Sequence, residues 1–275
     1  MIRIEPLPKI SCMMVTTDGR MDTLKRSYRC YLDQNYSNRE LLIVTDGSDA
    51  FKDELLQLVG TRPDVRFAFL DGKYTLGALR NVGVGLCFGD LFVQWDDDDF
   101  CAPGRLAVQC GYLLKHRKAR MCFFSDQLHY YFPTRQLFWN DWKKHSGGYK
   151  KYGLIPGTIM AYTKGFSYRY PASGEHAAAG EDSVMTTKIC HDDPAGVELM
   201  QGAGYLHVYS FHGRNVWDIE HHLEICRKRS VPRKQLLQYR QRLCRTLDYL
   251  RLDDEIDVVG IDGLAFTYRR QDAEG

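Results

Sequence analysis

Short apolar segments alternate with segments of helical periodicity over the first third of the chain, and this alternation constrains the fold more than any other feature. Apolar runs typical of strands occupy residues 10–17, 40–44, 65–70 and 90–95. Helical spacing is found between them, at residues 21–32, 51–59 and 77–87. Strands that alternate with helices of this length form a mostly parallel sheet flanked by helices. The predicted fold class is therefore α/β.

Polar turns follow three of these four strands. Thr16 and Asp18 close the first strand, Asp46 follows the second, and the acidic residues 96–99 follow the fourth. In a parallel sheet the carboxyl ends of the strands meet at one edge, where ligands bind. These side chains are therefore expected to lie along the same edge.

The second half of the chain is less regular. Three further strands are predicted at residues 120–131, 158–162 and 205–211, and one helix is predicted at residues 181–190. An aromatic and basic stretch at 132–152 has no clear period. From Trp217 to about residue 250 the spacing is helical, with a break at 230–232, and residues 258–268 are predicted to form a strand pair. The expected architecture is thus an α/β domain with a C-terminal helical extension.

The composition excludes several classes of protein. The chain has 37 Lys and Arg against 35 Asp and Glu and is 44% hydrophobic, so it is neither disordered nor surrounded by a basic field for nucleic acid. Its nine cysteines include no Cys-x-x-Cys pair, which argues against a structural zinc site and favours free thiols in a reducing compartment. No signal peptide and no apolar run of about 20 residues is visible, so a cytoplasmic protein is expected.

Four adjacent carboxylates, Asp96, Asp97, Asp98 and Asp99, follow the fourth predicted strand. Held together in a fold, they repel one another and favour protonation, exposure or a bound cation. Mg²⁺ and Mn²⁺ prefer oxygen ligands and are commonly held by one or two carboxylates together with substrate phosphates. The alternative is a solvated acidic turn that caps the next helix.

Three features later in the chain have both a functional and a structural interpretation. Glu181 and Asp182 either contribute to chemistry or simply favour the start of a helix. His212 follows a predicted strand and is either a ligand or a structural histidine. Trp139 and Trp142 either stack on a sugar ring or pack a loop.

The order of these motifs resembles that of family 2 glycosyltransferases, which have the GT-A fold. Residues 8–18 are similar to their first strand, and Asp46, with the Gly and Ser after it, resembles the end of their second. Arg80-Asn81 lies in a segment similar to their Ala-Arg-Asn-x-Gly helix, and the acidic run resembles their Asp-x-Asp motif. The resemblance runs in order over about residues 8–217. It implies a GT-A-type mostly parallel sheet flanked by helices.

The resemblance implies an inverting, metal-dependent transfer of one sugar from a nucleoside diphosphate sugar. The acceptor would be a hydroxyl of a saccharide or lipid-linked saccharide, as in polysaccharide biosynthesis. Asp182 would be the general base and Glu181 an acceptor contact. Asp98, with Asp96 and His212, would hold Mn²⁺ or Mg²⁺. The tryptophans at 139 and 142 would contact the acceptor. Because the Gln-x-x-Arg-Trp motif of processive synthases is missing, a single addition is favoured over polymerisation.

The resemblance also implies a set of residues that contact the nucleotide sugar: Thr16, Asp18, Asp46, Arg80, Asn81, Asp96 and Asp97. The first three would line the nucleobase pocket, and Arg80 would help hold the nucleotide or its phosphates. An aspartate that accepts a hydrogen bond from a uracil N–H favours UDP, while GDP and dTDP stay open. The nucleotide-binding half would be residues 1–105, the acceptor half 106–216, and the extension 217–275.

Two other functions are weighed against this one. A sugar nucleotidyltransferase also uses a nucleotide-binding α/β sheet, but it needs a longer Gly-rich loop after the first strand than residues 16–20 provide. A non-catalytic module that binds a nucleotide sugar or a saccharide would not need Asp96, Asp98, Asp182 and His212 together.

The segment at residues 225–251 has nine basic residues and one acidic residue. Leu236, Leu243, Leu247 and Leu250, with Tyr239, mark one apolar face of a helix. One interpretation is peripheral docking at the inner face of an anionic membrane, where a lipid-linked acceptor would be found. The alternative is a helix that packs on the catalytic domain and exposes its basic face to solvent.

Overall fold

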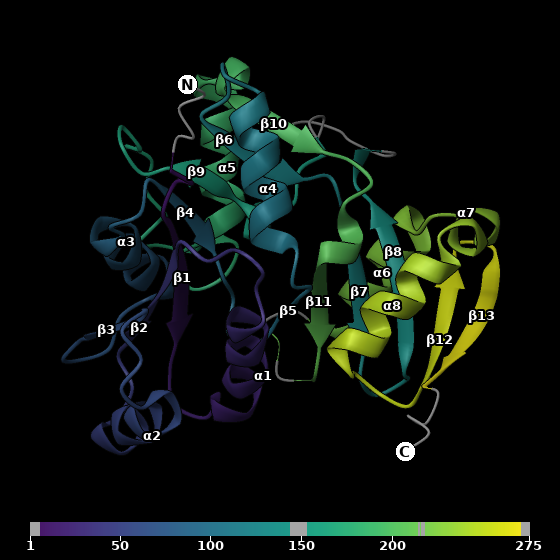
Figure 1. Cartoon of the computed structure of the whole chain (residues 1–275), viewed down its shortest axis with the longest axis horizontal. Coiled ribbons are helices and arrows are strands. Elements are labelled where there is room, and N and C mark those ends of the chain that lie inside the picture. The colour runs from purple at the N-terminus through teal and green to yellow at the C-terminus, as the bar shows by residue number, and fades with distance from the viewer. Residues whose placement is uncertain (1–5, 144–152, 214, 216–217, 271–275) are drawn as a thin grey trace. The chain divides into compact units, whose positions relative to one another are not determined.

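The computed structural model describes residues 6–143, 153–213, 215 and 218–270. The chain forms two compact units (Figure 1). The first unit comprises Met1–Asp98, Leu106–Phe123 and Pro156–Glu198. The second comprises Asp99–Arg105, Phe124–Ile155 and Leu199–Gly275.

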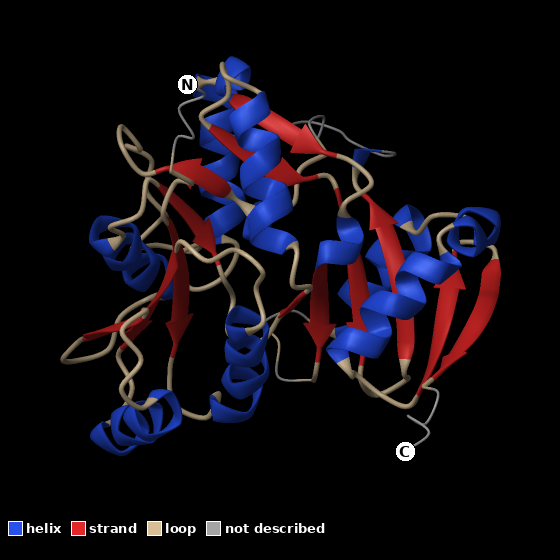
Figure 2. Ribbon diagram, in the orientation of Figure 1, coloured by secondary structure: helices blue, strands red, loops and turns tan. Residues whose placement is uncertain are grey.

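The first unit is built on seven strands in the order β10-β6-β9-β4-β1-β2-β3. Their bounds are β1 Ile10–Thr16, β2 Arg39–Thr45, β3 Val65–Phe69, β4 Leu91–Gln94, β6 Met121–Phe124, β9 Met160–Tyr162 and β10 Val197–Met200. Strands β4, β1, β2 and β3 run parallel, and β9 lies antiparallel between β4 and β6. The predicted mostly parallel sheet is confirmed, and Figure 2 shows it flanked by helices.

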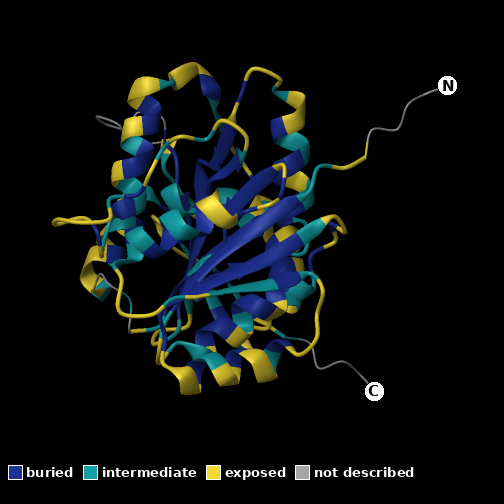
Figure 3. Cartoon of the chain, turned by 90° about the vertical axis from the view of Figure 1, so that its left-hand side faces the viewer, coloured by how far each residue is buried: buried dark blue, intermediate teal, exposed yellow. Residues whose placement is uncertain are grey.

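Helices cover the strands of the first unit, and Figure 3 shows buried strands beside helices with exposed outer faces. They are α1 Met21–Leu32, α2 Asp49–Val59, α3 Leu76–Leu86, α4 Arg105–Lys115 and α5 Glu181–Asp192. The Ser48 side chain caps α2 by accepting a hydrogen bond from a backbone N–H, and Thr75 caps α3 in the same way. Helix α3 packs on β1 and β2, and Gly83 permits this approach because a Cβ there would lie 2.5 Å from Met13 Sδ.

The strand register places the predicted polar turns at one edge of this sheet. Thr16 lies opposite Thr45, and Met13 lies opposite Gln94. The residues that follow β1, β2 and β4 therefore emerge at the same carboxyl edge, as the sequence predicts.

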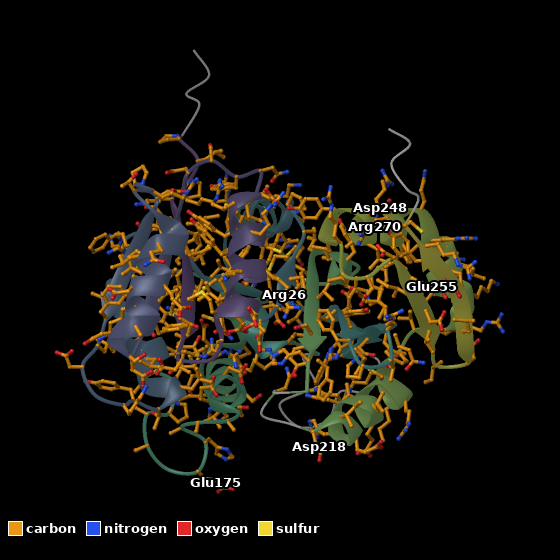
Figure 4. The ribbon with its side chains drawn as sticks, turned by 90° about the horizontal axis from the view of Figure 1, so that it is seen from below. Arg26, Glu175, Asp218, Asp248, Glu255 and Arg270 are labelled. Carbon is orange, nitrogen blue, oxygen red and sulfur yellow. The ribbon has the colours of Figure 1, made fainter. Side chains whose placement is uncertain are left out.

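The second unit is built on six strands in the order β13-β12-β8-β7-β11-β5. Their bounds are β5 Phe100–Cys101, β7 Asp126–Tyr131, β8 Gln136–Asp141, β11 His207–Phe211, β12 Glu255–Gly260 and β13 Gly263–Arg269. The predicted C-terminal strand pair is confirmed as β12 and β13, and β12 also pairs with β8. Glu255, labelled in Figure 4, lies on β12 and pairs with Arg269 at 2.8 Å.

Three helices of the second unit belong to the predicted C-terminal helical segment. They are α6 Ile219–Arg229, α7 Arg233–Gln238 and α8 Arg240–Leu250. Trp217, where the helical pattern was expected to begin, lies outside the described residues. Leu236, Leu243, Leu247 and Leu250 are all buried. The apolar face of this segment is therefore part of the protein core, which supports the packed-helix interpretation.

The prediction of one strand at residues 120–131 is wrong. The segment forms two strands, β6 and β7, which belong to different sheets. Ser125 separates them, and both its backbone N–H and its hydroxyl donate to the Met200 carbonyl, at 2.9 and 3.0 Å. The stretch at 132–152, which shows no period, contains β8; residues 144–152 lie outside the described part of the chain.

Two further observations concern the whole of the described chain. All nine cysteines are free, and eight of them are buried, as expected for thiols that are not paired in disulfides. Among the described residues, no helix is both long and apolar enough to cross a bilayer.

Glu40, on β2, is a buried carboxylate that connects several elements of the first unit. It is 3% exposed and accepts hydrogen bonds from Lys9 Nζ at 2.7 Å and Ser11 Oγ at 2.6 Å. The backbone N–H of Phe88 and Arg66 Nη2 also donate to it, at 3.1 and 3.2 Å. Burial alone would raise the pKa of Glu40, but these donors outweigh it and lower the pKa to about 2.

We expect Glu40→Gln to lower the free energy of unfolding by about 1–3 kcal/mol at pH 7. Because the folded pKa lies below the 4.5 of an ordinary glutamate, the wild-type advantage is present above that pH and is lost as the pH falls toward 2. Urea unfolding at pH 7 and in steps down to pH 3 measures this difference. The exposed Glu54 on α2 provides a control, since Glu54→Gln should change the stability by less than about 0.5 kcal/mol. If the difference in the free energy of unfolding between wild type and Glu40→Gln does not shrink as the pH falls, the stabilising role of the Glu40 carboxylate is contradicted.

Candidate active site

The three carboxylates directly after β4 in the first unit are paired with two arginines. Arg80 Nη1 lies 2.9 Å from Asp96 Oδ1. Arg20 donates from Nε and Nη2 to Asp97, and from Nη2 to Asp98 Oδ2 at 2.6 Å. The repulsion expected along the acidic run is therefore balanced by two guanidinium groups.

Arg80 connects the acidic turn to the start of α5. It comes from α3, is 6% exposed, and donates from Nε to Glu181 Oε1 at 2.8 Å. Burial alone would lower the pKa of Arg80, but the charges of Asp96 and Glu181 outweigh it and hold this pKa well above its usual value. Arg80 is thus a permanent buried cation that fixes two predicted functional carboxylates.

A chain of hydrogen bonds holds Asp96 from a second direction. Gln94 Nε2 donates to the two Asp96 oxygens at 3.2 and 3.1 Å, and Gln94 Oε1 accepts from the Tyr170 hydroxyl at 3.1 Å. The Asn81 amide in turn pairs with the backbone N–H and C=O of Tyr170, at 2.9 and 2.8 Å. The structure thus places Asn81, a predicted nucleotide contact, where it positions Tyr170.

Asp96 and Asp182 both lie close to one glycine of the first unit. Gly157 belongs to the short 3-10 helix Pro156–Thr158, and a Cβ there would lie 3.2 Å from Asp96 Oδ2 and 4.0 Å from Asp182 Oδ2. Asp182 is half-buried, and burial, with the neighbouring charge of Glu181, raises its pKa to about 6. A carboxylate with this pKa is suited to accept a proton near neutral pH. Asp96 and Asp182, which are 86 residues apart in sequence, therefore come together.

Asp18 and Asp46 lie after β1 and β2 and share a lysine. Asp18 accepts from the Ser48 backbone N–H at 3.0 Å and from its hydroxyl at 2.6 Å, and Lys73 Nζ lies 3.1 Å away. These donors, Ser48 foremost, lower the pKa of Asp18 to about 2. Lys73 also donates to the Asp46 carbonyl at 2.9 Å, and the Asp46 side chain accepts from the Thr17 hydroxyl at 2.9 Å.

Four of the predicted nucleotide contacts are buried in the first unit: Thr16, Asp46, Arg80 and Asp97. Thr16, at the end of β1, is 2% exposed, and Asp97 is 3% exposed. Burial raises the pKa of Asp97 to about 6, although Arg20 acts in the opposite direction. Thr16 and Asp97 are thus enclosed by the protein, and Asp97 is the principal hydrogen-bond partner of Arg20.

Three predicted site residues belong to the second unit. Trp139 is 2% exposed and donates its indole N–H to Asp126 at 2.7 Å, so in this unit it packs as a core residue. Trp142 is half-buried, with the Arg229 guanidinium 4.6 Å from its ring centroid. His212 is half-buried just after β11, and its backbone N–H donates to a side-chain oxygen of Asn215 at 2.9 Å.

The carboxylate oxygens of Asp96 and Asp98 are suitable ligands for a hard divalent cation. Within residues 6–143, 153–213, 215 and 218–270, however, no group of three or more His, Cys, Asp or Glu side chains is arranged to hold a metal ion. One or two carboxylates completed by nucleotide phosphates is the usual arrangement for Mg²⁺. The donor set therefore fits a cation that binds together with a nucleotide. His212 lies in the other unit, and its place among the ligands stays a prediction.

Three residues of this edge escape analysis of the sequence alone: Arg20, Lys73 and Tyr170. Arg20 and Lys73 lie in the turns after β1 and β3, so a search for cations as well as carboxylates in these turns would have found them. Tyr170 lies in a segment without regular secondary structure, and no pattern in the sequence distinguishes it.

In an open α/β sheet ligands bind beyond the carboxyl ends of the strands, and the acidic residues after β1, β2 and β4 lie at that edge of the first unit. This arrangement is typical of α/β enzymes that bind a ligand at the edge of the sheet. Residues 11–170 match Glycosyl transferase family 2. The chain belongs to this family of glycosyltransferase enzymes, and the predicted resemblance is confirmed.

Two bacterial relatives match part of the chain. A 103-residue segment is 35% identical to the putative colanic acid biosynthesis glycosyl transferase WcaA of Escherichia coli K12 and covers 37% of this chain and 36% of that protein. A 115-residue segment is 30% identical to an uncharacterized glycosyltransferase of Haemophilus influenzae and covers 41% of this chain and 35% of that protein. The matches thus span little more than a third of these relatives.

Solved structures share the fold. S. aureus TarS 1–349 has a TM-score of 0.59 at 14% identity, over 80% of this chain and 64% of that one. The mannosyltransferase PcManGT from Pyrobaculum calidifontis, solved with GDP-Man and Mn²⁺, has a TM-score of 0.54 at 13% identity, over 77% of this chain and 59% of that one. These likenesses confirm the predicted GT-A-type fold.

We expect Arg80→Met to lower the free energy of unfolding by about 3–5 kcal/mol, because it leaves the buried Glu181 and the half-buried Asp96 without their counter-charge. Arg80→Lys keeps the charge but not the planar guanidinium group, so it should lower the free energy of unfolding by less than Arg80→Met does. Urea unfolding at pH 7 measures both. Arg29→Met, which removes an exposed arginine paired with Asp33, serves as the control and should cost less than about 1 kcal/mol. Equal stabilities for Arg80→Met and the control would contradict this role.

Proposed function

We propose that this protein transfers a single sugar, with inversion, from a nucleoside diphosphate sugar to a hydroxyl of a saccharide or lipid-linked saccharide. The observation that carries the proposal is that Asp182 and Asp96 both lie close to Gly157, since a Cβ there would lie 4.0 Å from Asp182 Oδ2 and 3.2 Å from Asp96 Oδ2. This arrangement provides a proton acceptor close to the acidic turn.

In the proposed reaction an acceptor hydroxyl attacks the anomeric carbon of the donor sugar. A new C–O bond forms as the bond to the diphosphate breaks, and the electron pair leaves with the nucleoside diphosphate. Asp182 takes the proton of the hydroxyl, a step that typically contributes about 10²–10⁴-fold. Glu181, held by Arg80, is the proposed acceptor contact beside it.

Asp98 and Asp96 are the proposed protein ligands of Mn²⁺ or Mg²⁺, with His212 as the predicted third. When bound, such a cation stabilises the charge that develops on a leaving diphosphate. The support is the oxygen donor set and the Mn²⁺ in the mannosyltransferase that shares this fold. Arg80, Asp96 and the buried Asp97 would contribute to donor binding by holding the acidic turn in place.

UDP is the proposed nucleotide, with Thr16, Asp18 and Asp46 lining the nucleobase pocket. A uracil N–H donates a hydrogen bond, and both aspartates are acceptors. S. aureus TarS, which shares the fold, has been solved with UDP and with UDP-GlcNAc. GDP remains the main alternative, since the mannosyltransferase was solved with GDP-Man.

The acceptor is proposed to be a saccharide of a polysaccharide pathway, as the name of the E. coli relative suggests for that protein. Trp142, which is half-buried, is the better of the two proposed aromatic contacts because Trp139 is 2% exposed. The apolar face of the basic segment is buried, so contact with an anionic membrane would run through its exposed arginines and lysines.

We expect Asp98→Ala to abolish the Mn²⁺-dependent part of donor binding. Thermal-shift measurements with UDP, GDP, dTDP and their sugars, with and without Mn²⁺, identify the donor class, because a bound ligand stabilises by mass action. Calorimetry of the best donor then compares Asp98→Ala with wild type. Affinity that is unchanged by the substitution, or a panel in which no nucleotide stabilises the wild type, would overturn the proposed donor site.

We expect Asp182→Asn to retain donor binding and to lose at least about 10²-fold in kcat, since the amide cannot accept the proton. Single-turnover and steady-state assays with the donor identified above provide the measurement. Asp192→Asn, at the other end of α5, is the control, because Asp192 is exposed and pairs with Lys188. Turnover of Asp182→Asn close to that of the control would remove Asp182 as the base.

A further inference from the structure

We infer that Arg20 is an exchangeable counter-cation. It neutralises Asp98 in the metal-free protein, and it releases this carboxylate when a divalent cation binds while it stays anchored on Asp97. The inference rests on the proposed function of the acidic turn. It goes beyond that function because it assigns a role to a residue that is neither a ligand nor a base.

The contacts of Arg20 are unequally divided between the two carboxylates. Three of its four hydrogen bonds go to Asp97, from Nε at 2.9 and 2.7 Å and from Nη2 at 2.7 Å. A single one, from Nη2 at 2.6 Å, goes to Asp98. Release of Asp98 therefore breaks one hydrogen bond and leaves the fork on Asp97 intact.

The side chains of Asp97 and Asp98 also differ in how far they are buried. The Asp97 side chain is 5% exposed, the Asp98 side chain 16%, and the Arg20 side chain 30%. Removal of the partner of a buried charge is strongly destabilising, so the pair with Asp97 is the one that must persist. Asp98 and the guanidinium head are the more accessible members of the group, so their contact is the one that a solvent-borne cation can replace.

A divalent cation and a guanidinium group compete for Asp98. Both are positive, and within the few ångströms that separate two groups on one carboxylate their mutual repulsion opposes joint binding. The other arginine of the site differs in this respect. Arg80 is 6% exposed and bridges Asp96 to Glu181, so it has no comparable freedom to move. The acidic turn thus has one fixed and one exchangeable counter-cation.

Displacement of Arg20 from Asp98 would couple the binding of the cation to the binding of the nucleotide. The Nη2 group that leaves Asp98 remains beside the acidic turn on the anchored Arg20, and it can donate to an oxygen of the donor phosphates. The cation alone must displace Arg20 without this compensation. Wild-type protein should therefore bind Mn²⁺ more weakly without a nucleotide than with one.

The test is the affinity for Mn²⁺ alone, measured from the electron paramagnetic resonance signal of the free ion. Arg20→Met frees the carboxylates from their competitor, so we expect it to bind Mn²⁺ about 5-fold or more tightly than wild type, the factor for a partly exposed ion pair. Arg20→Lys should lie between the two because it keeps the charge without the fork. Arg29→Met removes a positive charge from the same region of the chain and should bind like wild type.

A second readout separates exchange from a purely structural role. Arg20→Met should melt at a lower temperature than wild type without metal, and saturating Mn²⁺ should narrow the difference between them. If the variant does not fold, Arg20→Lys and Arg20→Gln provide the same two comparisons. A difference in melting temperature that Mn²⁺ leaves unchanged would overturn the inference.

The remaining outcomes distinguish this inference from the proposed function. Mn²⁺ binding that is equal or weaker in Arg20→Met, but lost in Asp98→Ala, overturns the exchange and leaves the proposed metal site intact. If neither wild type nor Arg20→Met binds Mn²⁺, even with UDP present, the metal requirement of the proposed function fails and the exchange fails with it.

Discussion

The accommodation of four consecutive carboxylates is the constraint on which the rest of the structure depends. The acidic run follows a fully buried strand, so its charges cannot all be solvated. Arg20 and Arg80 neutralise the first three in one unit. In the other unit, Asp99 accepts from the Ser210 backbone N–H at 3.1 Å. His207 Nε2 lies 3.2 Å from Asp99, but burial holds the pKa of His207 well below its usual value, so this neighbour is a neutral imidazole. The turn after β1 and helix α3 therefore supply counter-charges, and strand β11 supplies a hydrogen bond.

This neutralisation also makes four chemically identical side chains unequal. Asp97 is almost fully enclosed by its pairing, and Asp96 is fixed by Arg80 on one side and Gln94 on the other. Asp98 accepts one hydrogen bond from Arg20, the more exposed of the two arginines. Within a run that looks uniform in the sequence, burial and pairing thus select which carboxylate is available to a ligand and which supports its neighbours.

The parallel half of the fold could be predicted because local periodicity determines it. The helix predicted at residues 21–32 has the same bounds as α1, and the polar turns share one edge as expected. The strand predicted at 120–131 failed because both strands there are buried on both faces, so no alternation marks the change of sheet at Ser125. Details of the site depend on pairings between distant residues. Asn81 lies in a motif typical of nucleotide contact, and it also pairs with the backbone of Tyr170, 89 residues away, a pairing that no local pattern encodes.

The basic C-terminal segment shows how charge patterning can suggest a partner when part of its cause is packing. Arg242 lies 4.7 Å from the ring centroid of Tyr205, and Arg240 lies 5.1 Å from that of Phe266. Guanidinium groups stack on aromatic faces while their aliphatic stems cover apolar surface, so such residues stabilise the fold without an external anion. Arg240 and Arg242 are both exposed, so the charges that stack on these rings also stay accessible to an acidic surface. The basic residues of this segment therefore have a role in packing whether or not an acidic partner binds.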